Sequence, residues 1–491
     1  MTPPSGRGPR FDFDADLPGS ADLRRVHFVA IAGSGMSGVA SLYRSAGCEV
    51  SGSDTADNAA VRELRALGAQ VFHGHDASQV GPADAVVVSG AVPEDNPELQ
   101  WARQHDLPVL HRAQAIAVLS RTRDSVAVAG TNGKTTTSAM LVGALSTAGR
   151  DPGFVIGAPL VDHRTSAALG TGPMVIEADE SDRSFVAYRP RVAVVTNVTA
   201  DHLDFYGDFA GVQQGYADFV DTLPRDGLLV SNADDAGSRA LAVHARAVGR
   251  RVVTWGESAE ADLRIEAIIP ARRQTVAEVT WRSSIGSVGA GHQHRVTIPL
   301  PGAHNLHNGA AALLAGVAGY EVDLADGLQA LEHFAGTRRR FEFLGRADGV
   351  DVIDDYAHNG PKVAAAVRAG RSVVADGGRL VVVFQPHMYS RTLAFAQDFA
   401  DGLSAAEVVV MLDVYGARES PIPGVSGETI VSAIRAGSGP IPELHYVALR
   451  EEALDRVAAV VRPGDLLLTV GAGDVTTIGP ELLRRRRGER G

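Results

Sequence analysis

The sequence predicts an α/β protein of three domains, each built on a mainly parallel β-sheet. A chain of 491 residues exceeds what one hydrophobic core usually organises. Apolar strand-like runs alternate with helical patterns from about Val26 onward, which is typical of parallel strands joined by crossover helices. This pattern begins again near Arg121, and a third set of strands begins near Arg338. We therefore expect domains at residues 24–120, 121–337 and 338–491, after a charged, Pro/Gly-rich and disordered tail at residues 1–23.

Composition and charge exclude several classes of protein. The chain is 45% hydrophobic with 54 Gly, which argues against a disordered chain, and its net charge of -12 argues against nucleic acid as a partner. A single cysteine, Cys48, cannot form an intramolecular disulfide, and a buried thiol is expected. The sequence shows no signal peptide and no apolar run of membrane-spanning length, so we expect a cytoplasmic protein without membrane insertion.

The first domain is predicted to open with a strand, a glycine loop and a helix. We expect a strand at Val26–Ile31, a helix at Met36–Ser45 and a second strand at Glu49–Gly52, which ends at Asp54. Further short strands are expected at Ala85–Ser89 and Val109–Leu110.

The second domain repeats this opening. The strand Ser125–Ala129 is followed by a glycine turn and the helix Lys134–Ala148, which Gly149 closes. Buried strands are expected at Met174–Ile176 and Val192–Thr196. Residues 262–299 alternate apolar and polar side chains, which indicates an antiparallel flank on the central sheet. In the third domain we expect strands at Val350–Ile353, Arg379–Phe384, Val408–Leu412 and Asp465–Val470.

The turn between the strand and the helix of the second domain predicts a phosphate-binding loop. Glycines there let backbone N–H groups surround phosphate oxygens at a helix N-terminus. Lys134 would meet the β- and γ-phosphates of a nucleotide, and Thr135 or Thr136 would place a hydroxyl on Mg²⁺. The spacing Gly130-x-x-Gly133-Lys134 is shorter than that of the general P-loop pattern.

Acidic residues and a histidine follow the next two strands. Residues 177–182 carry four acids, and residues 201–204 carry two acids around His202. Carboxylates and one imidazole at adjacent strand ends make a divalent-metal site beside a nucleotide plausible. Glu177 and His202 are the favoured ligands because each lies at or just beyond a strand end. Glu180, Asp182, Asp201 and Asp204 are as well explained by a solvated loop or a helix cap.

A second glycine loop lies in the first domain. Residues 33–38 match G-x-G-x-x-G, and Asp54 follows the second strand as in a dinucleotide-binding fingerprint. This pattern alone favours an NAD-dependent oxidoreductase. That alternative leaves the loop at Lys134 without a role, whereas two phosphate loops in separate domains favour two phosphorylated ligands, one of them ATP.

Nine motifs, in order along residues 24–483, resemble those of the Mur ligases. They are Gly33-Ser-Gly-Met-Ser-Gly38, Gly130-Thr-Asn-Gly-Lys-Thr-Thr136, Glu177-Ala-Asp-Glu-Ser-Asp182, Asp201-His-Leu-Asp204, Pro301-Gly-Ala-His-Asn305, Arg339-Arg-Phe-Glu342, Asp354-Asp-Tyr-Ala-His358, Gln385-Pro-His-Met-Tyr-Ser-Arg-Thr392 and Asp413-Val-Tyr-Gly-Ala-Arg-Glu419. The resemblance is strongest to the members that add L-alanine to UDP-N-acetylmuramate. It implies a Rossmann-like N-terminal domain for the UDP-sugar, a P-loop ATPase-like central domain for ATP, and a Rossmann-like C-terminal domain for the amino acid.

The resemblance also implies an activity. A carboxylate would be activated by ATP as an acyl phosphate and captured by an amine, giving an amide, ADP and phosphate in peptidoglycan precursor synthesis. The substrates would be small molecules, the cofactors ATP and Mg²⁺ or Mn²⁺, and the protein a monomer or homodimer. Lys134, Arg340 and the metal would neutralise charge during phosphoryl transfer, which needs no protein nucleophile.

Site residues follow from the same resemblance. The UDP-sugar would contact Gly33, Ser34, Gly35, Met36, Ser37, Gly38, Asp54 and Ser89. ATP would contact Gly130, Thr131, Asn132, Gly133, Lys134, Thr135, Thr136, His304, Asn308, Arg340 and Asp355, with Thr135, Glu177 and His202 on the metal. The catalytic set would be Lys134, Glu177, His202 and Arg340, and the amino acid would meet Tyr356, His358, His387 and Arg391.

Three segments depart from the pattern of the alanine-adding members. Asn132 stands where those members usually have His, and residues 359–362 read Asn-Gly-Pro-Lys in place of His-Pro-Thr-Glu. Met388 replaces a frequent Arg. The His-to-Asn change at Asn359 and the Glu-to-Lys change at Lys362 lie near the amine site, so they affect specificity more than the ATP chemistry. The departures leave two possibilities, a divergent alanine ligase and a paralogue that joins a different carboxylate and amine. An ATP-binding protein without ligase activity is a third alternative.

Overall fold

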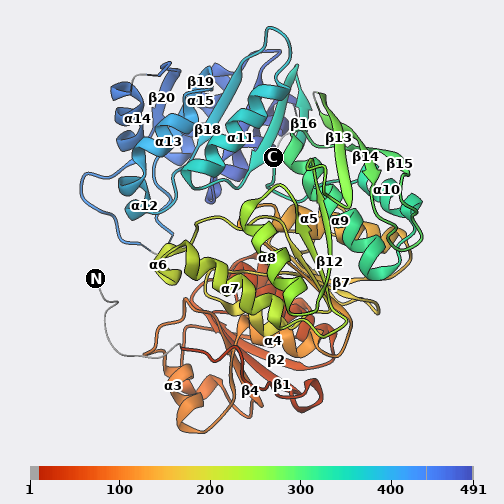
Figure 1. The fold of residues 1–491 in the computed structure, drawn as a ribbon. Coiled ribbons are helices and arrows are strands. Elements are labelled where there is room, and N and C mark those ends of the chain that lie inside the picture. The colour runs from red at the N-terminus through yellow and green to blue at the C-terminus, as the bar shows by residue number, and fades with distance from the viewer. Residues whose placement is uncertain (1–9, 272, 418, 438, 489–491) are drawn as a thin grey trace. The chain divides into compact units, whose positions relative to one another are not determined.

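The computed structural model describes residues 10–271, 273–417, 419–437 and 439–488, which form three β-sheets flanked by helices (Figure 1). The N-terminal sheet has five parallel strands in the order β3-β2-β1-β4-β5, an order typical of doubly wound nucleotide-binding folds. Its strands are β1 (Arg25–Val29), β2 (Glu49–Asp54), β3 (Gln70–His73), β4 (Ala85–Val88) and β5 (Val109–His111). Its helices are α1 (Ser34–Ser45), α2 (Ala59–Ala66), α3 (Pro97–Gln104) and α4 (Arg112–Ser120).

The central sheet has ten strands in the order β15-β14-β13-β12-β11-β10-β6-β9-β7-β8. Its middle is parallel from β13 to β7, and β8 pairs antiparallel at one edge. The strands are β6 (Ser125–Ala129), β7 (Gly153–Val155), β8 (Ala167–Ala168), β9 (Met174–Glu177), β10 (Val192–Val195), β11 (Leu228–Asn232), β12 (Arg251–Gly256), β13 (Leu263–Ala271), β14 (Gln274–Trp281) and β15 (Gln293–Ile298). The helices are α5 (Lys134–Thr147), α6 (Leu203–Tyr206), α7 (Phe209–Asp221), α8 (Ala236–Ala247), α9 (Ala303–Tyr320) and α10 (Leu324–Glu332).

The C-terminal sheet has six strands in the order β16-β17-β21-β18-β19-β20, all parallel except the edge strand β16. The strands are β16 (Glu342–Ala347), β17 (Val350–Asp355), β18 (Leu380–Phe384), β19 (Val408–Leu412), β20 (Glu443–Val447) and β21 (Leu466–Val470). The helices are α11 (Gly360–Val373), α12 (Tyr389–Ala394), α13 (Ala396–Leu403), α14 (Gly427–Ala436), α15 (Arg450–Val460) and α16 (Ile478–Arg486). Strands β17, β18, β19 and β21 are almost entirely buried because helices cover both faces of the sheet.

The predicted α/β class with parallel-dominated sheets is confirmed. Each predicted strand is present, with its ends within two residues of the expected positions. The alternating segment at 262–299 contains β13, β14 and β15 at one edge of the central sheet.

By packing, the described residues fall into two compact units, the first with the N-terminal and central sheets and the second with the C-terminal sheet. The first includes the described residues of 10–269, 276–298 and 303–335, and the second those of 270–275, 299–302 and 336–488. One hydrophobic cluster runs from Val26 and Phe28 of β1 to Phe185 and Phe219 of the central domain. The first two sheets therefore share a continuous core, while the third has its own.

Residues 10–23 differ from the disordered tail that we expected at residues 1–23, of which residues 1–9 lie outside the described part. The guanidinium of Arg10 donates to the carbonyl of Val92 at 2.6 Å, and Arg183 forms an ion pair with Asp14 at 3.1 Å. The Phe13 ring packs edge-on against His111, with centroids 5.3 Å apart. The aromatic side chains, the hydrogen bond of Arg10 and the ion pair of Asp14 give this short segment enough contacts to be ordered, in spite of its Pro/Gly-rich, charged composition.

The state of Cys48 and the character of the helices were both addressed by the composition. Cys48 is a buried free thiol, as expected, and donates to the carbonyl of Leu23. Across the described ranges, none of the helices has both the length and the apolar character that a bilayer crossing requires.

A buried polar network holds the N-terminal sheet to α3. Glu98 and His27 are both fully buried, and their side chains meet at 3.0 Å. Ser53 donates to the other carboxylate oxygen at 2.6 Å, and His75 lies 2.9 Å from the same atom. Burial opposes ionisation of Glu98, but the hydrogen bonds from His27, Ser53 and His75 outweigh burial and lower its pKa.

Replacement of Glu98 by alanine should therefore lower the free energy of unfolding by about 3 kcal/mol at pH 7, because His27 and Ser53 lose a buried acceptor. Since the folded pKa is depressed, the stabilisation is present above the unfolded pKa of about 4.3 and is lost as the pH falls through the folded value. Urea unfolding of Glu98→Ala and of the natural protein between pH 7 and pH 3 measures both effects. Asp57→Ala, which removes an exposed partner of Arg65, is the control and should cost about 0.5 kcal/mol or less. Equal losses in the two variants would contradict this role of Glu98.

Candidate active site

The loop between β6 and α5 has the backbone that a phosphate-binding loop needs. Gly130 and Gly133 have φ values of +133° and +89°, which residues other than glycine rarely adopt. A Cβ atom at Gly130 would overlap the Thr196 hydroxyl, and one at Gly133 would overlap the amide oxygen of Asn308. Both glycines are thus required by conformation and by the close approach of neighbouring segments.

The segment after β10 holds this loop in place. The N–H of Asn132 donates to the Asn197 amide oxygen at 3.0 Å, and the Thr196 hydroxyl donates to the carbonyl of Asn132 at 2.6 Å. Thr199 N–H donates to the Thr131 hydroxyl. The side chain of Asn132 itself is exposed, so this departure from the family pattern leaves the loop backbone intact.

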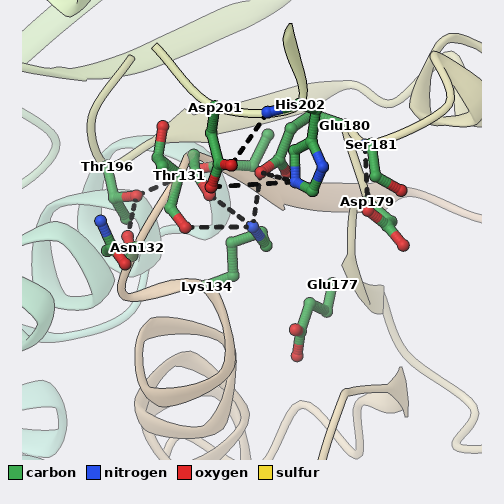
Figure 2. A network of polar contacts seen from close by, with 12 residues as sticks. Thr131, Asn132, Lys134, Glu177, Asp179, Glu180, Ser181, Thr196, Asp201 and His202 are labelled. Atoms are coloured by element: carbon green, nitrogen blue, oxygen red, sulfur yellow. Dashed lines mark hydrogen bonds and ion pairs between the residues drawn. The ribbon is translucent and has the colours of Figure 1, made fainter. Parts of the chain in front are cut away.

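Lys134 lies at the centre of the polar network (Figure 2). Its ammonium donates to the carbonyl of Gly130 at 2.6 Å and to Glu180 Oε1 at 2.8 Å. The ammonium is thus held directly over the loop, where the β- and γ-phosphates of a nucleotide would bring negative charge.

Glu180 is the carboxylate nearest to Lys134, and its side chain is only 4% exposed. Burial raises the pKa of the Glu180 carboxyl even though Lys134 favours its ionised form. Its Oε2 atom is buried and accepts no hydrogen bond from any residue that the structure describes. A buried carboxylate oxygen without a partner fits a Mg²⁺ ligand, because a hard cation would compensate its charge.

Glu177 has different partners. Its Oε1 accepts from the Thr135 hydroxyl at 3.0 Å, and its Oε2 accepts from the N–H of Gly157 at 2.5 Å. Figure 2 shows the Glu177 side chain apart from the contacts around Lys134. Glu177 therefore orients Thr135, one of the expected metal ligands.

His202 completes the central group. Its Nε2 lies 4.0 Å from Glu180 Oε1 and 3.9 Å from Asp201 Oδ2. The residue has a φ of +53°, a left-handed conformation that is unusual for a side chain of this size and often occurs at functional sites. The structure thus brings Lys134, Glu180 and His202 together, while Glu177 pairs with Thr135, the residue after Lys134.

The two residues expected to contact adenine lie on α9. Asn308 is buried beside Gly133 and accepts from the Thr137 hydroxyl at 3.3 Å. His304 is exposed one turn earlier on the same helix. Asn308 thus links α9 to the phosphate loop.

The first glycine loop lies at the carboxyl ends of β1 and β4. Asp54 is buried at the end of β2 and accepts from the N–H groups of Ala32 and Ala56, both at 2.9 Å. Asp54 therefore fixes the loop backbone. Ser89, directly after β4, is half-buried, and the side chain of Ser34 lies outside the described part of the structure.

In the second unit, adjacent arginines have different surroundings. Arg339 donates to the carbonyl of Gly471 and lies 3.3 Å from Asp354, so it holds the loop after β21. Arg340 has its guanidinium carbon 5.7 Å from the centroid of the Tyr356 ring. Within the described residues no side-chain hydrogen bond or ion pair holds Arg340, so it is the arginine of the pair that is available for a ligand.

Asp355 is the last residue of β17 and accepts from the N–H groups of Phe341 and Ala357 at 2.8 Å. Burial raises the pKa of this carboxyl in spite of the two donors and of Arg340. Asp355 therefore lies beside the segment that carries Arg340, since Phe341 is the next residue along the chain.

The side chains expected on the amino-acid side also cluster within the second unit. The rings of His358 and His387 are 5.9 Å apart, and Arg391 donates to the carbonyl of His358. Burial, with the charge of Arg391 nearby, lowers the pKa of His358 to about 4, so this imidazole is neutral at pH 7. Asn359, a departure from the family pattern, caps α11 by accepting from the N–H of Lys362.

Two features were not predicted from the sequence. The sequence does not favour Glu180 over a solvated loop residue, although in the structure it contacts Lys134. The sequence predicts only a strand end at Thr196, and not that residues 196–199 hold the phosphate loop. A Thr-Asn pair directly after a strand beside the phosphate loop is the signal that could have identified it.

Three family descriptions match the chain in domain order. "Mur ligase family, catalytic domain" matches residues 25–124, "Mur ligase middle domain" residues 128–316, and "Mur ligase, glutamate ligase domain" residues 339–473. These segments contain the two glycine loops, the central polar network and the clusters of the second unit.

Curated relatives and solved structures agree with these matches. UDP-N-acetylmuramate–L-alanine ligase of Kineococcus radiotolerans is 48% identical, with 98% of this chain and 99% of the relative covered. The protein of that name from Saccharopolyspora erythraea is 46% identical, with 96% of each chain covered. The crystal structure of UDP-N-acetylmuramate–alanine ligase from Thermotoga maritima is 28% identical with a TM-score of 0.78, covering 95% of this chain and 100% of the other. The chain therefore belongs to the Mur ligase family.

Proposed function

We propose that this protein is an ATP-dependent ligase that joins L-alanine to the carboxylate of UDP-N-acetylmuramate, with release of ADP and phosphate, in the synthesis of peptidoglycan precursors. The carrying observation is the Lys134 ammonium held over the β6–α5 loop beside the buried carboxylate of Glu180. The choice of substrates is supported by the names of relatives that are 44–48% identical over 93–98% of this chain.

The reaction would proceed in two steps. A carboxylate oxygen of the sugar attacks the γ-phosphorus, ADP leaves, and an acyl phosphate forms. The alanine amine then attacks the acyl carbon, phosphate leaves, and the amine loses a proton. Lys134 and Arg340 would neutralise charge on the transferred group. Tyr356, His358, His387 and Arg391 would bind the amino acid, with the Arg391 guanidinium pairing with its carboxylate.

Mg²⁺ would be held by Thr135 and His202, as the family resemblance implies, and by Glu180 in place of the expected Glu177. The reason for this choice is that Oε2 of Glu180 is buried without a partner among the described residues, whereas both oxygens of Glu177 accept hydrogen bonds. When bound, the ion supplies charge neutralisation at the phosphates. Glu177 would keep the Thr135 hydroxyl directed at the metal. The adenine would lie against His304 and Asn308 of α9, and Asp355 would hold the ribose. We infer that the enzyme acts in the cytoplasm as a monomer or homodimer.

The departures at Asn132 and Asn359 agree with this function, because the first side chain is exposed and the second caps a helix. An NAD-dependent oxidoreductase, the alternative from another class, is not supported. Both carboxylate oxygens of Asp54 accept hydrogen bonds from backbone N–H groups, those of Ala32 and Ala56, and the matched family is one of ligases.

Phosphate release from ATP by the purified protein tests the proposal. We expect release with Mg²⁺ to require both UDP-N-acetylmuramate and L-alanine, and mass spectrometry to detect the amide product. Glycine, L-serine and D-alanine offered singly measure the selectivity of the amine site. Amide formation with another amino acid in preference to L-alanine would contradict the proposed amine, and ATP binding without any amide product would contradict the ligase function.

A further inference from the structure

Arg112 is the one residue of α4 that is not buried. Residues 113–120 of this helix are all buried against the N-terminal sheet and the central domain. The helix is capped by His111, whose ring packs against Phe11 and Phe13. Arg112 therefore projects from a rigid support, and its guanidinium is positioned without a large loss of backbone freedom.

The guanidinium of Arg112 lies against the first glycine loop. A Cβ atom at Gly35 would overlap Nη1 of Arg112 and would lie 3.2 Å from its guanidinium carbon. The absence of a side chain at Gly35 therefore lets the cation approach the loop backbone at the expected place of the UDP diphosphate.

On its other side, Arg112 faces residues 177–182 of the central domain, the acidic loop that follows β9. Its Nη2 lies 3.9 Å from Asp179 Oδ2, and it makes no closer polar contact with the residues that the structure describes. The two side chains are 33% and 47% exposed, so their attraction is partly screened by water. A pair this long leaves most of the guanidinium donors free for another anion.

The expected UDP site lacks positive charge, which the guanidinium donors of Arg112 could supply. The residues expected there are Gly33–Gly38, Asp54 and Ser89, which include one anion and no cation. A diphosphate carries about two negative charges, and backbone N–H groups alone supply only partial positive charge to it. Arg112 is placed to supply the missing positive charge in a bidentate form that suits phosphate oxygens.

We propose that Arg112 binds the diphosphate of the UDP-sugar, and that Asp179 competes with the diphosphate for the guanidinium when the substrate is absent. This inference rests on the proposed function. The acidic loop would then respond to both nucleotides, since Glu180 contacts Lys134 at the ATP loop while Asp179 faces Arg112 at the sugar-nucleotide loop.

Calorimetric titration with UDP, which has the diphosphate but neither the sugar nor its carboxylate, tests the inference. Arg112→Gln should raise the Kd for UDP and for UDP-N-acetylmuramate by the same factor, about 10- to 100-fold, while Arg112→Lys should recover part of the loss. The Kd for ATP should stay within about twofold. Asp179→Asn keeps the acceptor for the Ser181 N–H and should bind UDP about two- to fivefold more tightly, because the competing charge is removed. Arg62→Gln, an exposed change on α2 in the same domain, is the matched control and should bind UDP as the natural protein does.

The possible outcomes separate this inference from the proposed function. If Arg112→Gln binds UDP as tightly as the natural protein, or loses affinity for UDP-N-acetylmuramate alone, the assignment to the diphosphate is wrong while the ligase function stands. Weaker or unchanged UDP binding by Asp179→Asn would overturn the competition. If the natural protein binds neither UDP nor UDP-N-acetylmuramate, both the inference and the proposed substrate are wrong.

Discussion

Replacement of Lys134 by alanine is expected to lower kcat for amide formation by about 10³-fold, because the ammonium would stabilise charge that develops during phosphoryl transfer. The carbonyl of Gly130 and the Glu180 carboxylate hold the ammonium over the loop. Steady-state rates of phosphate release at saturating substrates measure the effect. Lys134→Arg keeps the charge but not the compact geometry, and it should recover only part of the rate.

Folding should survive this substitution. Glu180 loses its cation in Lys134→Ala, but burial already raises the pKa of its carboxyl, so it takes up a proton more readily than an exposed acid does. We expect the midpoint of thermal unfolding to change by a few degrees or less. Arg150→Gln, an exposed change on the same domain, should leave both the rate and the stability unaltered. A Lys134→Ala enzyme that is folded and retains more than about a tenth of the natural kcat would contradict the catalytic role.

The phosphate loop could be predicted from the sequence because its signals are local. A buried strand, two glycines, a lysine and a periodic helix follow one another directly, and the structure has β6 and α5 at Ser125–Ala129 and Lys134–Thr147. Strands β17, β18, β19 and β21 were equally predictable, since both faces are buried and the runs are continuously apolar.

The partner of Lys134 could not be predicted, because it depends on how the chain turns after β9. Four acids occur within residues 177–182, and their spacing alone does not say which one faces the phosphate loop. In the structure Glu180 faces Lys134, Glu177 faces Thr135, and Asp179 faces Arg112. Proximity to the strand end favours Glu177 as the acid nearest the phosphates, whereas the direction of the turn after β9 determines that Glu180 contacts Lys134.

The hydrophobic core that the first two domains share could not be predicted from the sequence either. The restart of the strand pattern near Arg121 correctly separates two sheets, since β5 and β6 belong to different ones. Which helix faces pack across that boundary depends on tertiary contacts, such as Gly38 of α1 against Ala167 of β8. Similarly, contacts far apart in the chain, such as Arg10 with Val92, order a segment whose composition indicated disorder.

Glu180→Gln is expected to lower kcat by about 10²- to 10³-fold and to raise the Mg²⁺ concentration needed for half-maximal rate, since the variant removes a charged ligand from the site. Gln keeps an oxygen that can accept from Lys134, so the loop should retain its geometry. Glu177→Gln is the matched variant, with the same chemical change three residues earlier. It should lower kcat by only about tenfold, because Gln can still accept from the Gly157 N–H while its amide donates to Thr135.

The pH dependence of stability separates a metal ligand from a structural ion pair. The folded pKa of Glu180 is raised, so this group favours the folded state at pH values below its unfolded pKa, and this contribution is lost as the pH rises through the folded value. Glu180→Gln should therefore be at least as stable as the natural protein at pH 8 without metal, yet gain less stability when Mg²⁺ and ATP are added. Thermal unfolding at pH 5 and pH 8, with and without Mg²⁺ and ATP, measures both. Should Glu177→Gln show the larger loss of rate and of Mg²⁺ response, the strand-end acid that the sequence favoured is the metal ligand, and Glu180 serves only to hold Lys134.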